Sequence, residues 1–324
     1  MTYLFELSQE NLDLAVQEVI ALTLHPFYEC QDSFLILKNT LDHKKIRELG
    51  ERLACTKKIS QILFISKKQN LIRDVKHFSW KKVYQKSIAV RARAELKDQE
   101  KELATRVLDS LQKGHVDLED PITKIEFLQI MGKVYAILVL KEIHHDFEER
   151  KAHKRPALHP SAMHPKLARA MINLTGIKTG EETRTTITDP FVGTGGILIE
   201  AADMGFKTQG FDIDPEMLQR CRTNLDFFHI QDANIKLNDA TKIKEKLDYV
   251  VADLPYGKMT KPITSQLYED FFKNLRTILK KRAVLCFEDK EETINSITKN
   301  NFKILHSFAI PVHKSMTRRV VVIE

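Results

Sequence analysis

Strands and helices alternate in a regular order through the second half of this 324-residue chain, and that order constrains the fold more than any other feature. Runs of β-forming residues predict strands at 186–188, 208–211, 249–252 and 283–287, with helical segments between them. This order predicts an α/β domain with a mostly parallel sheet and helices on both faces. Ligands of such sheets bind beyond the carboxyl ends of the strands, so the informative residues should directly follow strands.

The first half of the chain mixes strands and helices without that regular order. Apolar residues at helical spacing predict helices at 12–22 and 43–53, and residues 144–156 are dense in charge and end in proline, as linkers do. We therefore expect an N-terminal α+β domain over 1–60, a second α+β domain over 61–145, a linker over 146–158 and the α/β domain over 159–324.

Composition argues against several classes of protein. No apolar run approaches the ~18 residues of a membrane span, and the N-terminus lacks the features of a signal peptide. The four cysteines form no C-x-x-C pair, which argues against zinc ribbons and favours the reducing cytoplasm. His153, His159 and His164 suggest a metal site, but two of them precede prolines where a linker enters a helix. We expect a cytoplasmic monomer with no metal and no membrane contact.

Positive charge is concentrated in one part of the chain, whose net charge is +7. Between Lys57 and Lys97 there are twelve lysines and arginines and only two acids, with four aromatic residues among them. Such a patch binds polyanions by neutralising phosphates and releasing counterions, but a solvated helix face over core aromatics has the same composition. Charge alone leaves both interpretations open. The candidate RNA contacts are Lys57, Lys58, Lys81, Lys82, Arg91 and Arg93.

A glycine turn, D-P-F-V-G-T-G-G from Asp189 to Gly196, follows the first strand of the α/β domain. Glycines let the backbone approach a ligand that side chains would exclude. Asp212 stands sixteen residues past Gly196 at the end of the next strand, where a carboxylate can bridge two ribose hydroxyls. A dinucleotide and S-adenosylmethionine both fit this arrangement, and a purely structural turn stays open. The candidate cofactor residues here are Asp189, Phe191, Gly193, Thr194, Gly195, Gly196, Asp212 and Ile213.

Asp239 and Ala240 follow the segment I-K-L at 235–237, which is the third predicted strand and precedes the fourth at 249–252, and they are further cofactor candidates. A carboxylate at this place could accept a hydrogen bond from an adenine amino group. The signal is weak by itself, because Asn-Asp is also ordinary turn chemistry.

The sequence D-L-P-Y-G from Asp253 to Gly257, after the fourth strand, carries the most specific chemistry. An exocyclic amine of a base is a poor nucleophile, because its lone pair is delocalised into the ring. Two acceptors on the amino hydrogens would favour a pyramidal nitrogen, and the Asp253 carboxylate and the Leu254 carbonyl, held by Pro255, can supply them. Tyr256 offers a flat face for the base to stack upon. A proline turn without function is the alternative.

These four residues, Asp253 to Tyr256, are therefore the predicted catalytic residues, and Asp253 is also a candidate cofactor contact. The acceptors would discriminate against a base without the amine, because buried polar groups left unpaired are costly. No metal is required, since a sulfonium donor is itself the electrophile and the catalytic work is positioning.

The two motifs together resemble those of class I amino-methyltransferases that act on nucleic acids, which have a Rossmann-like domain. The stretch from Arg155 to Leu174, which begins R-P-A-L-H-P-S-A-M-H-P, is similar to the segment before the cofactor loop in archaeal tRNA guanine-10 N2-methyltransferases. The sequence H-K-S-M-T-R-R from His313 also resembles that family's ending. Residues 87–142 resemble a THUMP domain, an RNA-binding module, behind a ferredoxin-like domain.

The resemblance implies S-adenosylmethionine as cofactor, S-adenosylhomocysteine as product and tRNA as substrate. It places Asp189, Gly193, Gly195 and Asp212 at the cofactor, Asp239 near adenine, and Asp253, Pro255 and Tyr256 at the guanine amino group. Many relatives have proline where Leu254 stands, but a backbone carbonyl is the expected acceptor, so leucine should be tolerated. The THUMP domain implies a grip on the acceptor end of tRNA.

Several alternatives stay open. Position 10 of tRNA is the favoured target, with guanine 6 of tRNA or a ribosomal guanine as the nearest alternative, and either m2G or m22G as product. A nicotinamide-dependent oxidoreductase shares the glycine turn and the ribose acid, and an RNA-binding protein with an inactive enzyme domain is a third class. A eukaryotic relative works with a small activating protein partner, so this chain could need one.

Overall fold

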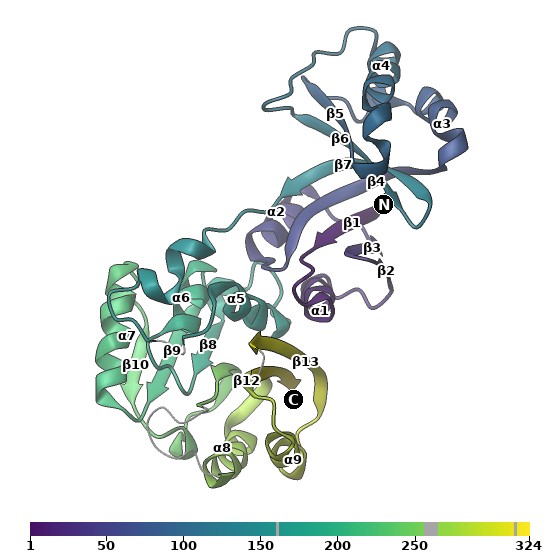
Figure 1. Ribbon diagram of the computed structural model, residues 1–324. Helices are drawn as coiled ribbons and strands as arrows, with labels where there is room; N and C mark the ends of the chain where they lie inside the picture. The colour runs from purple at the N-terminus through teal and green to yellow at the C-terminus, as the bar shows by residue number, and fades with distance from the viewer. Residues whose placement is uncertain (160–161, 256–264, 314–315) are drawn as a thin grey trace. The chain divides into compact units, whose positions relative to one another are not determined.

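The computed structural model describes residues 1–159, 162–255, 265–313 and 316–324 and divides into two compact units (Figure 1). The first unit comprises Met1–Leu12, His25–Gly50 and Thr56–His144. The second unit comprises Asp13–Leu24, Glu51–Cys55 and His145–Glu324, so two short early segments belong with the second half of the chain. Among the described residues, no helix is both long and apolar enough to span a membrane.

A seven-stranded sheet in the order β2-β3-β1-β4-β7-β6-β5 forms the first unit. Neighbouring strands are antiparallel except β5 and β6, which are parallel. The strands are β1 (Thr2–Leu7), β2 (Tyr28–Gln31), β3 (Phe34–Lys38), β4 (Thr56–Lys67), β5 (Ile88–Ala92), β6 (Thr123–Ile130) and β7 (Lys133–Glu142). The helices are α2 (His43–Arg52), whose last two residues belong to the second unit, α3 (Leu71–His77) and α4 (Glu100–Leu111).

The expected boundary between residues 60 and 61 falls inside β4, and strands of both expected N-terminal domains share this one sheet. The assignment of these residues to a ferredoxin-like and a THUMP domain stays a prediction.

The second unit contains the α/β domain that the alternating order predicted. Its sheet has the order β10-β9-β8-β11-β12-β14-β13, parallel from β10 to β12 and antiparallel at β14 and β13. The strands are β8 (Thr186–Asp189), β9 (Lys207–Asp212), β10 (Asn234–Leu237), β11 (Leu247–Asp253), β12 (Leu279–Glu288), β13 (Ile304–His313) and β14 (Met316–Ile323). The helices are α1 (Leu12–Thr23), α5 (Pro165–Leu174), α6 (Gly196–Asp203), α7 (Pro215–Phe227), α8 (Ser265–Ile278) and α9 (Glu291–Lys299).

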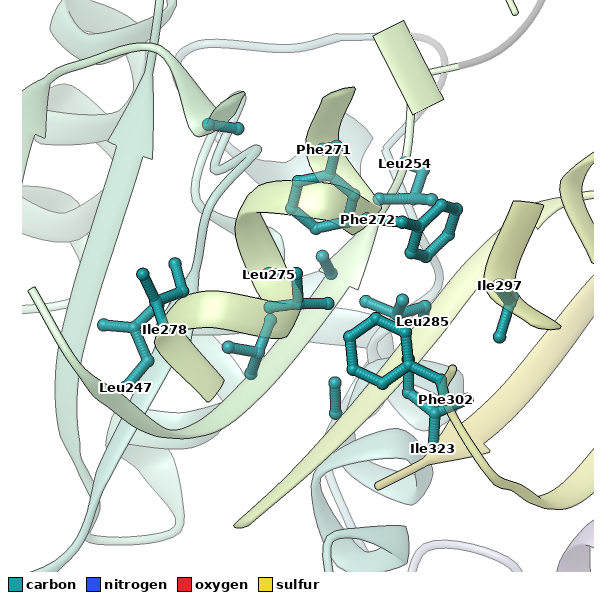
Figure 2. Close-up of a cluster of buried hydrophobic side chains, with 14 of the residues drawn as sticks. Leu247, Leu254, Phe271, Phe272, Leu275, Ile278, Leu285, Ile297, Phe302 and Ile323 are labelled. Carbon is teal, nitrogen blue, oxygen red and sulfur yellow. The ribbon is translucent and has the colours of Figure 1, made fainter. Parts of the chain in front are cut away.

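Helices cover both faces of this sheet, as two neighbouring residues of β9 show. Successive side chains of a strand point to opposite faces. A Cβ on Gly210 would lie 2.7 Å from Val192 and 2.9 Å from Leu198 of α6, so the missing side chain lets α6 pack closely on one face. Phe211 belongs to a different buried cluster, which includes α8 residues Phe271 and Phe272 together with Leu254 (Figure 2).

Local capping fixes where two helices of this unit begin. The Asp214 side chain accepts a hydrogen bond from the Glu216 amide at 2.8 Å, and Pro215 opens α7. Pro165 opens α5 in the same way, as predicted, behind the His164 cap. The start of α7 keeps Ile213 and Asp214 directly beyond the carboxyl end of β9.

Helix α1 is joined to the second unit by a buried polar cluster that we call the α1 anchor: Glu18, Arg52, Asn173 and the backbone of 54–55. The fully buried Glu18 carboxylate accepts hydrogen bonds from the amides of Ala54 and Cys55, both at 2.8 Å, and from Asn173 Nδ2 at 2.7 Å. Asn173 Oδ1 accepts from Arg52 Nε at 3.0 Å. Burial raises the pKa of Glu18, although these three hydrogen bonds lower it.

The segment expected to be a linker also packs into the second unit. Arg150 Nε donates to the Glu200 carboxylate at 2.6 Å, and Arg169 Nε donates to the same carboxylate at 3.2 Å. Glu200 is fully buried in α6, where a charge needs such partners. Residues 146–158 therefore contribute to the environment of α6 and its preceding turn.

Candidate active site

Three acidic residues end three neighbouring strands of the second unit. Asp189 is the last residue of β8, Asp212 of β9 and Asp253 of β11. The chain leaves β8 for β9 and β10 on one side and returns to β11 on the other, so β8 and β11 flank a topological switch point. Such points open a crevice beyond the carboxyl ends of the strands, where ligands bind. The structure thus brings together three residues that the sequence analysis selected separately.

The glycine turn between β8 and α6 leaves its backbone open to a ligand. Gly193 and Gly195 have φ angles of +51° and +85°, a region that favours glycine. A Cβ on Gly195 would lie 2.8 Å from Cys221 Sγ, whereas the nearest atom to a Cβ on Gly193 is the Phe191 carbonyl at 3.9 Å. Gly195 therefore packs tightly against α7, and the space beside Gly193 is free for a bound group. The Gly193 amide donates to Asp212 Oδ2 at 2.9 Å, which ties the turn to the second strand.

The electrostatics of these acids favour a positively charged ligand. Burial raises the pKa of Asp189 well above its ordinary value, and the nearby charges of Asp253 and Asp212 raise it further, against the hydrogen bond from the Phe191 amide. Burial also raises the pKa of Asp212, against hydrogen bonds from the amides of Asp214 and Gly193. A cation placed among these carboxylates would relieve their desolvation and mutual repulsion.

Two exposed apolar side chains lie beside Asp212. Ile213, a predicted cofactor residue, is 70% exposed, and Leu237 at the end of β10 is 62% exposed. Leu237 pairs in register with Asp212, so both side chains lie near the predicted ribose acid. Leu237 was missed by the sequence analysis, although its position at the end of a strand could have indicated it. The pair offers an apolar surface of the kind that a purine ring packs against.

Asp239 is engaged with its own turn. One carboxylate oxygen accepts hydrogen bonds from the Thr241 amide at 2.9 Å and the Thr241 hydroxyl at 2.7 Å, and the other lies 3.1 Å from Lys242 Nζ. Burial raises the pKa of Asp239, but the Thr241 and Lys242 contacts outweigh it and the net shift is downward. Asp239 thereby caps the short 3-10 helix η7 (Ala240–Lys242), in which Ala240 is buried. The predicted contact of this turn with adenine stays a prediction.

The predicted catalytic segment begins at the end of β11, beside β12. Asp253 pairs in register with Cys286, whose buried thiol makes a hydrogen bond with the Asp253 side chain. The Leu254 amide donates to the Cys286 carbonyl at 2.8 Å, a bond that a proline at this position could not make. The Leu254 side chain is fully buried, which accounts for leucine here. Tyr256, the predicted stacking residue, lies outside the described residues.

Asn224 of α7 holds the glycine turn through hydrogen bonds, and the sequence did not indicate it. Its Nδ2 donates to the Thr194 carbonyl at 2.9 Å and to the Ala157 carbonyl at 3.1 Å, and its Oδ1 accepts from the Ala157 amide at 2.9 Å. These bonds hold the expected linker segment against the predicted cofactor residue Thr194. An asparagine within a helix gives no sequence signal for such a role.

Three of the six predicted RNA contacts are engaged in ion pairs within the first unit. Lys58 is buried and donates to Glu126 at 2.6 Å, and Arg93 donates to the same carboxylate at 2.8 Å. Arg91 lies 3.9 Å from Glu100. These carboxylates already neutralise part of the positive charge that the sequence analysis counted.

The other three predicted contacts, Lys57, Lys81 and Lys82, are exposed and have no ion pair within the described part of the chain. The aromatic residues among the bases pack on the core of the first unit: Phe64, Phe78 and Tyr84 are partly buried against it. Trp80 is 1% exposed, donates from Nε1 to the Val75 carbonyl at 2.8 Å and packs against Phe78. The aromatics therefore support the core interpretation, while the exposed lysines still suit phosphate contacts.

The residues of the crevice fit S-adenosylmethionine. The open space beside Gly193 admits a ligand against the backbone, the carboxylates suit a cation, and Ile213 and Leu237 suit an adenine ring. In residues 1–159, 162–255, 265–313 and 316–324, no group of three or more His, Cys, Asp and Glu side chains is placed to hold a metal ion.

A seven-stranded sheet of this order, with a glycine turn after β8 and acids at the ends of β8, β9 and β11, is the fold of the class I methyltransferases. Comparison with known proteins agrees. Residues 152–318 match the family UPF0020, described as RMKL-like, methyltransferase domain. Over its whole length the chain has the fold of TrmN from Thermus thermophilus, with a TM-score of 0.54 at 18% identity, covering 100% of this chain and 99% of that one.

The chain belongs to this methyltransferase family and shares most of its length with the tRNA (guanine(10)-N2)-dimethyltransferases. The protein of that name from Methanothermobacter thermautotrophicus is 33% identical over 289 residues, which are 85% of this chain and 84% of the relative. Its counterpart from Pyrococcus abyssi is 33% identical over 264 residues, which are 77% of this chain and 78% of the relative.

Proposed function

We propose that this chain uses S-adenosylmethionine to methylate the exocyclic N2 amino group of guanosine 10 in tRNA. The names of the relatives support the target, and a methyltransferase family gives no support to the nicotinamide-dependent alternative. One structural observation carries the chemistry: Asp253 ends the strand that borders the switch point and Leu254 follows it, next to the glycine turn.

In this proposal, Asp189, Gly193 and Asp212 bind the cofactor, which supplies a methyl group on a positively charged sulfur. Ile213 and Leu237 contact its adenine ring. The carboxylate charges hold the cation, and the open backbone at Gly193 lets the ligand lie against the turn. These residues determine where the methyl group is presented.

Asp253 and Leu254 orient the amine in the proposed reaction. Each accepts one amino hydrogen, so the nitrogen lone pair is directed out of the plane of the base for in-line transfer. Guanine lies inside a tRNA stem and must leave its pair to reach this crevice. The transfer would leave a positively charged nitrogen, which gives up one proton to the Asp253 carboxylate in this proposal. A single amino hydrogen then remains, which either acceptor can hold. The relatives are named dimethyltransferases, and we propose m22G as the final product.

The first unit is proposed to hold the tRNA through exposed bases that include Lys57, Lys81 and Lys82. Phosphate contacts by such side chains position an RNA without reading its sequence. We propose that the chain acts as a monomer, and a small activating partner is the first addition to test if the chain alone is inactive.

The test is incubation with unmodified tRNA and S-adenosylmethionine, followed by nucleoside mass spectrometry that maps the modified position. Methylated guanosine at position 10 is expected; modification only at position 6, or only of ribosomal RNA, would refute the proposed target. Asp253→Asn should bind cofactor within about threefold of the wild type and lose about 100-fold in transfer rate, as when one preorganised polar group is removed.

Asp248→Asn is the matched control, because Asp248 lies on the same strand and pairs with Lys280 and Lys281 away from the crevice. It should retain the wild-type rate. Full activity of Asp253→Asn would remove the assignment of the catalytic segment.

A further inference from the structure

One face of α8 contacts all three loops of the proposed site. Tyr268, Phe271 and Asn274 recur every three residues along this helix and therefore lie on a common side. Their partners are the segment after β11, the glycine turn after β8 and the turn after β10. No sequence motif marked these residues.

Tyr268 contacts the catalytic segment. Its hydroxyl donates to the Pro255 carbonyl at 2.5 Å. The proline ring fixes φ at residue 255, and the Leu254 amide is bound to Cys286 at 2.8 Å, so the Tyr268 bond restrains the next peptide of the segment. The Leu254 carbonyl, the proposed second acceptor, is held between these two restraints. Burial, together with the charges of Glu288 and Asp253, raises the pKa of Tyr268, which keeps the hydroxyl protonated as a donor.

Asn274 contacts the turn after β10. Its Nδ2 donates to the Ala240 carbonyl at 3.0 Å and to the Ile243 carbonyl at 3.1 Å. These two acceptors bracket the 3-10 helix η7, so one amide group fixes the turn that carries Asp239. The bond lies at the proposed adenine end of the site and far along the helix from Tyr268.

Phe271 lies between them and contacts the glycine turn. Its ring centroid is 4.9 Å from that of Phe191, in an edge-on arrangement. Phe271 is 1% exposed and shares the buried cluster of Leu254 and Phe272 (Figure 2). The buried Phe271 contact thus lies between the two polar contacts on this face.

We infer that α8 aligns the proposed site, with Tyr268 as a positioning residue for methyl transfer and Asn274 as a positioning residue for cofactor binding. The inference rests on the proposed function, because it assigns the segment after β11 to the amine and the turn after β10 to adenine. It requires the two residues to affect different steps, which a helix that served stability alone would not produce.

The experiment compares Tyr268→Phe and Asn274→Leu in the full chain. Both substitutions keep the approximate shape and remove hydrogen-bond donors. Tyr268→Phe should lower the single-turnover transfer rate about 10-fold, which is the size of effect expected from the loss of one hydrogen bond. It should leave the Kd for S-adenosylhomocysteine within about twofold of the wild type. Asn274→Leu should raise that Kd about 10-fold and leave the transfer rate at saturating cofactor within about twofold. Calorimetry measures Kd without any need for turnover.

Tyr249→Phe is the matched control, because it removes a tyrosine hydroxyl that bonds to Lys281 on the same sheet. It should change neither parameter. Equal effects of Tyr268→Phe and Asn274→Leu on both parameters, or no effect of either, would overturn the inference while wild-type activity upheld the proposed function. A wild-type chain that does not methylate guanosine would overturn the proposed function and this inference with it.

Discussion

Glu18→Ala should destabilise the protein strongly, although residue 18 is far along the chain from the proposed active site. The Glu18 side chain is fully buried and accepts three hydrogen bonds, from the amides of Ala54 and Cys55 and from Asn173. Each buried donor left without an acceptor costs about 1–3 kcal/mol. Water entering the space would satisfy part of this demand, so we expect a loss of about 4 kcal/mol in the free energy of unfolding.

Urea unfolding followed by circular dichroism measures this loss at neutral pH. Asp13→Ala is the control on the same helix, since Asp13 is exposed in the first turn and should contribute below about 1 kcal/mol through the helix dipole. Glu18→Gln keeps the volume and one acceptor oxygen and should fall between the two. A loss below about 1 kcal/mol for Glu18→Ala would refute the account of the α1 anchor, because it would mean that the three donors find other acceptors.

Three further predictions concern the site and the RNA surface. Asp189→Asn should make the ligand-free protein more stable than the wild type at neutral pH. The pKa of Asp189 is raised in the folded protein, so the wild type loses stability as the pH rises from the ordinary pKa of 3.8 through the folded-state pKa. Thermal melting across pH 4–8 should show that the advantage of the variant shrinks in acid. Gly195→Ala should cost about 2 kcal/mol from its φ of +85° alone and more from contact with Cys221, so adding Cys221→Ala should recover part of the loss in urea unfolding. Lys81→Ala and Lys82→Ala should each reduce the slope of log affinity for tRNA against log salt by about 1, and an unchanged slope would remove them from the RNA surface.

The acids of the site could be predicted because each lies at the end of a strand. Strand ends of a parallel sheet meet at one edge, so Asp189, Asp212 and Asp253 could be placed together from local patterns alone. Asn224 and Tyr268 could not, because their value depends on which side of a helix faces a loop far away in sequence. Tyr268 acts 13 residues from Pro255, and Asn224 acts 67 residues from Ala157.

For the basic residues, local sequence predicted more free positive charge than the fold leaves. Counting charges between Lys57 and Lys97 could not reveal Glu126, which lies 68 residues from Lys58 and 33 from Arg93 and accepts a hydrogen bond from each. The fold pairs charges that the sequence keeps apart. A local excess of lysine and arginine therefore overstates the charge available to a nucleic acid.

The boundaries of the two units could not be predicted from local sequence patterns either. The apolar spacing of residues 12–22 predicted the helix α1 correctly, but not that Asp13–Leu24 would belong with the second half of the chain. Within that unit, α1 is hydrogen-bonded to α5 through Glu18 and Asn173, a pair of polar residues with no common motif. Secondary structure followed from spacing, whereas membership of a unit depends on contacts between residues far apart in the sequence.

The α1 anchor has a consequence for biosynthesis. Glu18 and Asn173 are separated by 155 positions, so a ribosome adding ~5–20 residues per second needs roughly 8–30 s to deliver the second after the first. Through that interval the apolar face of α1 has no finished docking surface, and a nascent chain must keep it from aggregating. Translation speed and chaperone supply should therefore influence the yield of this protein more than that of a chain whose early helices pack with their immediate successors.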